Sequence, residues 1–136
     1  MPILNLSVSA QADAKLSASI SELLTEATRV HLGKDPKVTA VVLQYIAPTD
    51  WIIGGKSLAE LGQKSFSLDI KVTAATNTKT QIASYIEAVF LAMERLLGGV
   101  HQTSYIVVHE VAAAAWGFGG KTQEFRFIEA KIKDAA

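Results

Sequence analysis

The chain has 136 residues, of which 49% are hydrophobic and 19% charged, and its 13 basic and 13 acidic side chains give a formal net charge of zero. The neutral charge excludes the electrostatic footprint of a nucleic-acid-binding protein, and the absence of cysteine excludes disulfides, thiolate chemistry and cysteine-bound metals. No basic leader is apparent and no stretch approaches the ~18 apolar residues of a membrane-spanning helix, so we expect one cytoplasmic domain without nucleic-acid or membrane partners.

The first half of the chain predicts a strand, a helix and a second strand. In the opening stretch MPILNLSV, apolar Leu4, Leu6 and Val8 alternate with polar side chains, which is typical of a half-buried strand. The next apolar side chains recur with helical spacing, and Gly33 follows where a helix C-cap belongs. These three elements are expected near residues 2–8, 12–32 and 38–46.

The second half of the chain repeats the first. The stretch WIIGGKS, which begins at Trp51, matches WGFGGKT, which begins at Trp116, at a spacing of 65 residues. Further upstream a spacing of 66 residues fits better and aligns Leu4 with Ile70. A second strand, helix and strand are therefore expected near residues 67–73, 78–97 and 104–111. We predict a single domain made of two repeats, about 2–65 and 67–130.

Two β-α-β units joined in this way predict an α/β (α+β) fold. Because crossovers between parallel strands are right-handed, both helices would cover one face of a four-stranded mixed sheet. The other face still carries apolar side chains, such as Val42 and Ile46 or their neighbours. An uncovered apolar face on a duplicated chain predicts self-association.

Taken together, these features resemble the tautomerase superfamily, and the chain looks like two fused 4-oxalocrotonate tautomerase-like units. The resemblance rests on Met1-Pro2 opening a strand, on the β-α-β length of each half, and on the two glycine hairpins. The stretches LGKDPKVTAVV and SYIVVHEVAAAAWG also resemble macrophage migration inhibitory factor. The resemblance implies a homotrimer with pockets at the subunit boundaries, where an N-terminal proline acts as a base.

Pro2 is the candidate catalytic residue. Removal of Met1 would give Pro2 a free secondary amine, and burial in an apolar pocket would favour the neutral, basic form of that amine. The alternative interpretation is a proline that merely starts a strand, where no N–H is required. The equivalent position in the second half is Leu68, whose nitrogen is an amide, so at most one pocket per subunit can be catalytic.

The resemblance also implies substrate-binding residues. Lys34 matches a pocket lysine that would hold a carboxylate or polarise a carbonyl; the alternative is a solvated lysine near a helix C-terminus. Tyr105 matches a pocket tyrosine, and the alternative is an aromatic residue that packs on a strand. Trp51, Trp116 and Phe118 flank the glycine hairpins, where they would line the apolar mouth of the pocket or pack at a subunit interface.

Some positions depart from the family pattern. The catalytic arginines of the 4-oxalocrotonate enzymes would fall near Ala12 and Ala40, and neither residue is basic. Arg126 lies in a C-terminal stretch that could reach a pocket, but no carboxylate can be assigned to the pocket from the sequence. The three histidines lack the spacing of metal ligands.

We therefore predict a tautomerase that interconverts the keto and enol forms of a small 2-oxo acid, with Pro2 as the general base and without a cofactor or metal. One alternative is a catalytically silent protein of the same fold that acts as a binding or assembly module, which the missing arginines favour. A second alternative is a dehalogenase, hydratase or decarboxylase of the same superfamily. The missing arginines and the lack of a pocket carboxylate argue against this alternative.

Overall fold

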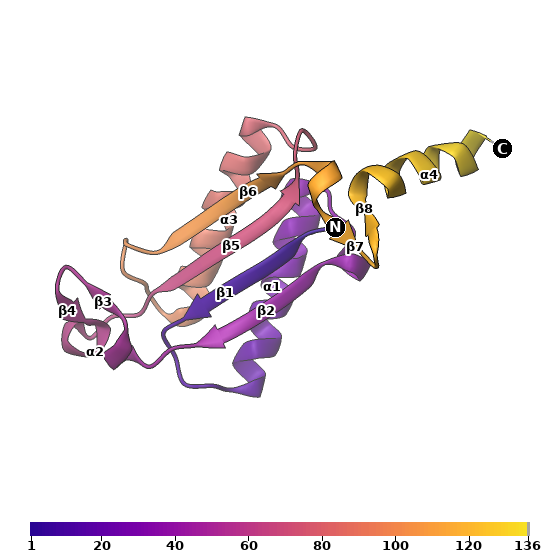
Figure 1. Ribbon diagram of the computed structural model, residues 1–136. Coiled ribbons are helices and arrows are strands. Elements are labelled where there is room, and N and C mark those ends of the chain that lie inside the picture. The colour runs from indigo at the N-terminus through magenta and orange to yellow at the C-terminus, as the bar shows by residue number, and fades with distance from the viewer. Residues whose placement is uncertain (136) are drawn as a thin grey trace.

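The computed structural model describes residues 1–135 and centres on a four-stranded mixed sheet (Figure 1). The strands lie in the order β2, β1, β5, β6. Strand β1 lies parallel to β2 and antiparallel to β5, which in turn lies parallel to β6. The bounds of the strands are Ile3–Val8 for β1, Ala40–Tyr45 for β2, Phe66–Thr73 for β5 and Tyr105–Val111 for β6.

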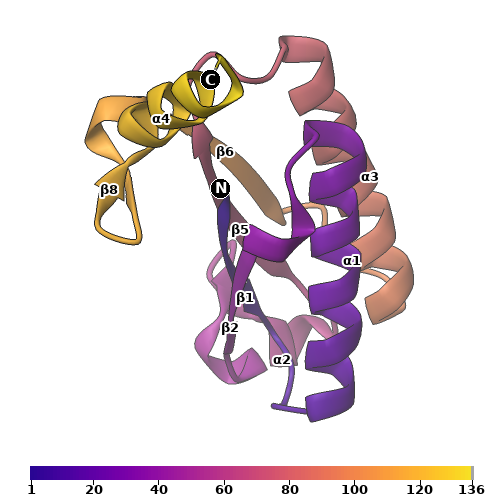
Figure 2. The same ribbon diagram turned by 90° about the vertical axis from the view of Figure 1, so that its right-hand side faces the viewer.

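Two long helices cover one face of this sheet (Figure 2). They are α1, Ala14–Leu32, and α3, Lys79–Leu97. The side chain of Asp13 caps the start of α1, and Thr78 and Gln81 form a capping box at the start of α3. Both helices end at a left-handed glycine, Gly33 with φ 67° and Gly98 with φ 77°. The order of the strands in the sheet and the placement of both helices on one face confirm the predicted fold class.

The hydrophobic core lies between the helices and the covered face of the sheet. Leu4, Leu6 and Val8 of β1 point into it and are almost completely buried, as their alternation predicts. Burial of a side chain of this kind stabilises the fold by about 1.5–3 kcal/mol. Inside the core, the hydroxyl oxygens of Thr28 and Tyr85 lie 3.1 Å apart and connect α1 to α3.

Each β-α-β unit is followed by the same short arrangement of a 3₁₀ turn, a glycine hairpin and a helix. After the first unit these are η2 (Pro48–Asp50), β3 (Ile52–Ile53), β4 (Lys56–Ser57) and α2 (Leu58–Leu61). After the second unit they are η3 (Ala113–Ala115), β7 (Gly117–Phe118), β8 (Lys121–Thr122) and α4 (Gln123–Ala135). The first residue of each closing helix donates its N–H to the carbonyl of the hairpin tryptophan, Leu58 to Trp51 and Gln123 to Trp116, each over 2.8 Å.

The two units differ in the length of the closing helix. Helix α2 ends after one turn at Gly62, which has a φ of 63°. Phe127 stands at the equivalent position of α4, and this helix continues to Ala135. Figures 1 and 2 show α4 beyond the end of the sheet where β1 begins, on the side away from α1 and α3. The sequence analysis predicted neither closing helix.

The second face of the sheet carries both polar and apolar side chains and is open in the single chain. Val42, Tyr105 and Val107 are 50%, 57% and 43% exposed. Among them, Nε2 of His109 lies 2.9 Å from the Asp69 carboxylate. Within residues 1–135, no helix combines the length and the apolar character needed to cross a membrane.

Candidate active site

A cavity of about 550 Å³ lies at the end of the sheet where β1 begins. On the side of the sheet it is lined by Met1, Lys34, Thr73, Ala74, Thr76 and Ala113. Helix α4 supplies Gln123, Glu124, Arg126 and Phe127. The N-terminus and the C-terminal helix therefore meet at one site (Figure 1).

The sheet holds Pro2 in a fixed position. Pro2 is buried next to Met1, and its carbonyl oxygen accepts a hydrogen bond from the Ala40 N–H over 3.1 Å. The following residue, Ile3, pairs with Ala40 on one side and with Lys71 on the other. Since β1 is held by two neighbouring strands, a nitrogen at its start is preorganised with respect to the cavity.

The electrostatic environment at the N-terminus favours a neutral amine. Burial lowers the pKa of the Met1 α-amine, because the charged form loses solvation, and the positive charge of Lys34 lowers this pKa further. Burial also lowers the pKa of Lys34 itself. The same two effects would act on any amine that occupied this place.

Lys34 reaches the cavity because α1 ends immediately before it. The left-handed Gly33 reverses the chain and the 3₁₀ turn η1, Pro36–Val38, then leads into β2. The Lys34 ammonium donates a hydrogen bond to the Thr76 hydroxyl oxygen over 2.8 Å, and that hydroxyl donates to the Thr73 carbonyl over 2.6 Å. The loop after α1 and the loop after β5 thus hold the Lys34 ammonium in place through a hydroxyl group, without an ion pair to a carboxylate.

Arg126 forms the α4 side of the site. Its Nε–H donates to the Phe118 carbonyl over 2.9 Å, and its guanidinium carbon lies 4.7 Å from the centre of the Phe118 ring. Arg126 and Met1 also line an adjoining cavity of about 290 Å³. In that second space Glu129 is paired with Lys121 and Lys133, each over 3.4 Å.

The structure brings some of the predicted site residues together and separates others. Lys34 lies beside the N-terminus, and Phe118 reaches the site through its contact with Arg126. The Trp116 carbonyl anchors the start of α4. Within one chain, Tyr105 and Trp51 lie at the other end of the sheet: Tyr105 pairs with Ser67 at the start of β5, and Trp51 precedes hairpin β3–β4 (Figure 1).

The sequence did not point to seven of the cavity residues: Thr73, Ala74, Thr76 and Ala113 on the side of the sheet, and Gln123, Glu124 and Phe127 on α4. The inference that the pocket has no carboxylate is wrong, because Glu124 lines it. The sequence did not indicate the carboxylate because no helix was predicted after the second hairpin. The apolar spacing in QEFRFIEAKIK is the signal that could have indicated a helix there.

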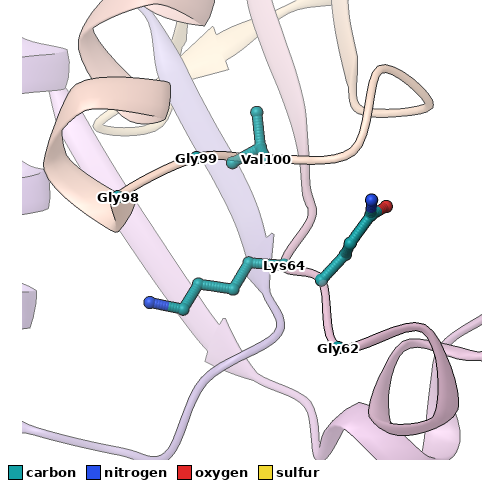
Figure 3. A pocket seen from close by; sticks show the side chains of 6 residues that line it. Gly62, Lys64, Gly98, Gly99 and Val100 are labelled. Carbon is teal, nitrogen blue, oxygen red and sulfur yellow. The ribbon is translucent and has the colours of Figure 1, made fainter.

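The second unit has a smaller cavity, of about 250 Å³, at the corresponding place (Figure 3). It is lined by Gly62, Gln63, Lys64, Gly98, Gly99 and Val100. Val100 stands where the 66-residue spacing places Lys34, and the Lys64 ammonium donates to the Leu97 carbonyl at the end of α3 over 2.7 Å. This cavity therefore has neither a chain terminus nor an uncommitted cation.

Known proteins provide an independent comparison by sequence. No family model matches the chain. The protein named "Probable tautomerase RSp1151" from Ralstonia nicotianae is 32% identical over 60 residues, which make up 44% of this chain and 92% of that protein. Nearly the whole of that relative thus aligns with less than half of this chain.

Solved structures share the fold over most of the chain. The structure described as "Q0 fused 4-OT wild type symmetric trimer" has a TM-score of 0.77 at 20% identity, and the match covers 90% of this chain and 96% of that one. A macrophage migration inhibitory factor homologue from Prochlorococcus marinus has a TM-score of 0.70 at 24% identity, with 88% and 97% covered. The sequence relative and the shared fold together show that the chain belongs to the tautomerase superfamily and is a tautomerase-type enzyme.

Proposed function

We propose that the protein catalyses keto–enol tautomerisation of a small 2-oxo or enol acid, with Pro2 as the general base after removal of Met1. The observation that carries this proposal is the environment of the N-terminal amine, where burial and Lys34 both lower the amine pKa. A base is most effective when its pKa lies near the working pH. A ring nitrogen at the start of a paired strand has the fixed position that proton transfer requires.

The proposed reaction transfers one proton between carbon and the base. The neutral Pro2 nitrogen removes a proton from the carbon next to the carbonyl, and the electron pair moves onto the carbonyl oxygen to give an enolate. The Lys34 ammonium stabilises the charge that develops on this oxygen. Return of a proton from Pro2 to oxygen or to carbon completes the reaction, so no oxidant, metal or cofactor is consumed.

The open face of the sheet supports a homotrimer as the active assembly. Val42, Tyr105 and Val107 are exposed there in the single chain, and the fold relative described as a symmetric trimer has the same architecture. In such an assembly, Tyr105 and Trp51 of a neighbouring copy would approach the cavity that they cannot reach within their own chain. Trp116 and Phe118 would provide apolar walls next to the base.

The first experiment measures ketonisation of phenylenolpyruvate together with the intact mass of the protein. We expect loss of the Met1 mass and a Pro2-dependent rate, with Pro2→Ala lowering kcat/KM by on the order of 100-fold or more. Pro48→Ala, which changes the proline of turn η2 at the far end of the sheet, serves as the control. With Met1 removed, an equal catalysed rate in Pro2→Ala and the unaltered protein would refute Pro2 as the base, whereas the absence of catalysis in both proteins would favour a silent binding protein.

Glu124 supports a second candidate function, the hydration-linked chemistry of a dehalogenase or hydratase. A carboxylate in the cavity wall is a suitable base for activating water. The test is halide release from a 3-halo-2-alkenoic acid, compared between the unaltered protein and Glu124→Gln. Release that persists in Glu124→Gln rules out this role.

A further inference from the structure

Arg126 is held in place by neutral groups and retains donors for a ligand. Its Nε–H bonds to the Phe118 carbonyl, and the Phe118 ring packs against the guanidinium. Among the described residues, no carboxylate lies within ion-pair distance of Arg126 and its two terminal nitrogens have no hydrogen-bond partner. A half-buried guanidinium with its outer edge unoccupied is well suited to bind a carboxylate with two parallel hydrogen bonds.

Gln123 adds an independent indication of a ligand. Its side chain lines the same cavity, and the residue is only 8% exposed. Its side-chain nitrogen Nε2 is buried and finds no acceptor within residues 1–135. Buried amide donors are nearly always paired, so an oxygen atom from outside the chain is expected next to this one.

Comparison of the two repeats shows that this arrangement belongs to the second unit alone. At the 65-residue spacing, Leu58 corresponds to Gln123 and Leu61 corresponds to Arg126. Both positions lie within α2, where apolar leucines replace the amide and the guanidinium. These two positions therefore have polar side chains, Gln123 and Arg126, only in the unit whose closing helix lies beside the N-terminus.

The charges around the cavity are also incompletely balanced. In the adjoining space the single carboxylate of Glu129 pairs with both Lys121 and Lys133 and balances only one of these two positive charges. Lys34 bonds only to a hydroxyl, and Arg126 only to a carbonyl. Glu124 is the single carboxylate among the residues that line the larger cavity. The two cations together exceed this charge and favour an anionic ligand.

From these observations we infer that Arg126, assisted by the Gln123 amide, binds the carboxylate of the substrate. The inference rests on the proposed function and specifies it: the substrate is a 2-oxo acid whose carboxylate faces α4 while its 2-oxo oxygen faces Lys34. Arg126 would thereby replace the arginines that the resemblance places near Ala12 and Ala40. Phe127, in the same wall, suits an apolar substituent on the acid.

A binding experiment tests this inference without requiring turnover. The probes are 3-phenylpropanoate, an unreactive acid, and its uncharged amide, with both dissociation constants measured by calorimetry on the full-length protein. We expect the acid to bind more tightly than the amide, by on the order of 10- to 100-fold, because charged hydrogen bonds to the carboxylate are lost with the amide. Arg126→Ala should abolish this preference.

The two glycine hairpins offer a matched control. A Cβ atom at Gly119 would come within 2.7 Å of Arg126 Nη2, so Gly119→Ala must displace the guanidinium. At Gly54, which has nearly the same φ, a Cβ atom would meet nothing within 4 Å. We expect Gly119→Ala to weaken the preference for the acid and Gly54→Ala to leave it unchanged.

Gln123→Leu copies the residue of the first repeat and separates ligand binding from folding. Since the change removes an unpaired buried donor, it should preserve or raise the melting temperature while it weakens binding of the acid. An unchanged preference for the acid in Arg126→Ala, or no preference in the unaltered protein, would overturn the inference. Pro2→Ala should still bind the acid more tightly than the amide, even if the protein proves inactive. Failure of the proposed function can therefore be told apart from failure of the carboxylate site.

Discussion

Lys34 and Thr76 are hydrogen-bonded at the cavity wall, where the lysine ammonium donates to the threonine hydroxyl oxygen over 2.8 Å across 42 residues of sequence. The bond joins the loop after α1 to the loop after β5 and holds a cation beside the N-terminal amine. The partner is a neutral hydroxyl, so the positive charge of Lys34 is not cancelled and acts on the amine.

The pH dependence of activity should report this charge. In Lys34→Ala the amine loses the second of the two causes that lower its pKa, so its pKa rises and less of it is neutral at a given pH. The acidic limb of the kcat/KM profile should therefore move to higher pH. Thr76→Val keeps the charge and should leave the limb almost in place. A limb that moves to lower pH in Lys34→Ala would contradict the assignment.

Gly54 and Gly119 should show equal costs in stability. Both have a left-handed backbone, with φ 61° and 59°, where alanine is disfavoured by about 1–2 kcal/mol. The Arg126 guanidinium is the end of a flexible side chain and can move away from the new methyl group. Chemical denaturation should therefore give similar losses for Gly54→Ala and Gly119→Ala. A much larger loss at Gly119 would show that Arg126 is needed for stability as well.

The contact between Thr28 and Tyr85 predicts unequal effects of two substitutions. Both hydroxyls are buried, and Thr28 Oγ1 also donates to the Leu24 carbonyl over 2.7 Å. Thr28→Val leaves the Tyr85 hydroxyl unpaired and should cost about 1–3 kcal/mol. Tyr85→Phe removes that hydroxyl, while Thr28 keeps its bond to Leu24, and should cost less. Equal losses of unfolding free energy would contradict this account.

Tyr85 should also limit stability at alkaline pH. Burial raises its pKa from 10.0 to about 12, because the phenolate would lose its hydration. The stabilisation of the neutral phenol is fully present below pH 10 and is lost as the pH rises towards 12, by on the order of 2 kcal/mol. Between these pH values, the free energy of unfolding, measured by chemical denaturation, should fall less steeply with pH for Tyr85→Phe than for the unaltered protein. Parallel curves would exclude Tyr85 as a source of the alkaline loss.

Val42 and Val30 test whether the open face of the sheet is an interface. They are similarly exposed in the single chain, at 50% and 55%, but Val42 lies on β2 and Val30 on α1. A carboxylate buried without a partner at an interface is strongly unfavourable. Val42→Glu should therefore dissociate the proposed homotrimer in sedimentation experiments, whereas Val30→Glu should not. Intact oligomers in both variants would argue against this face.

The expected strands and helices of the two units agree with the structure because their signals are local. Alternation of Leu4, Leu6 and Val8 specifies which face of β1 is buried, since successive side chains of a strand point to opposite faces. Gly33 ends α1 as predicted, because a left-handed backbone suits a residue without a Cβ atom. The closing helices were missed because α2 has only one turn and α4 shows its apolar spacing close to a chain end.

The sequence by itself determined the duplication and the fold class, since each depends on residue type and spacing along the chain. Only the tertiary structure decided what surrounds the N-terminus. Arg126 and Lys34 are 92 positions apart in the sequence, and their shared cavity exists because the first turn of the second closing helix lies at the end of the sheet where β1 begins. No local pattern encodes that meeting, because it depends on how the sheet, two loops and a helix pack together.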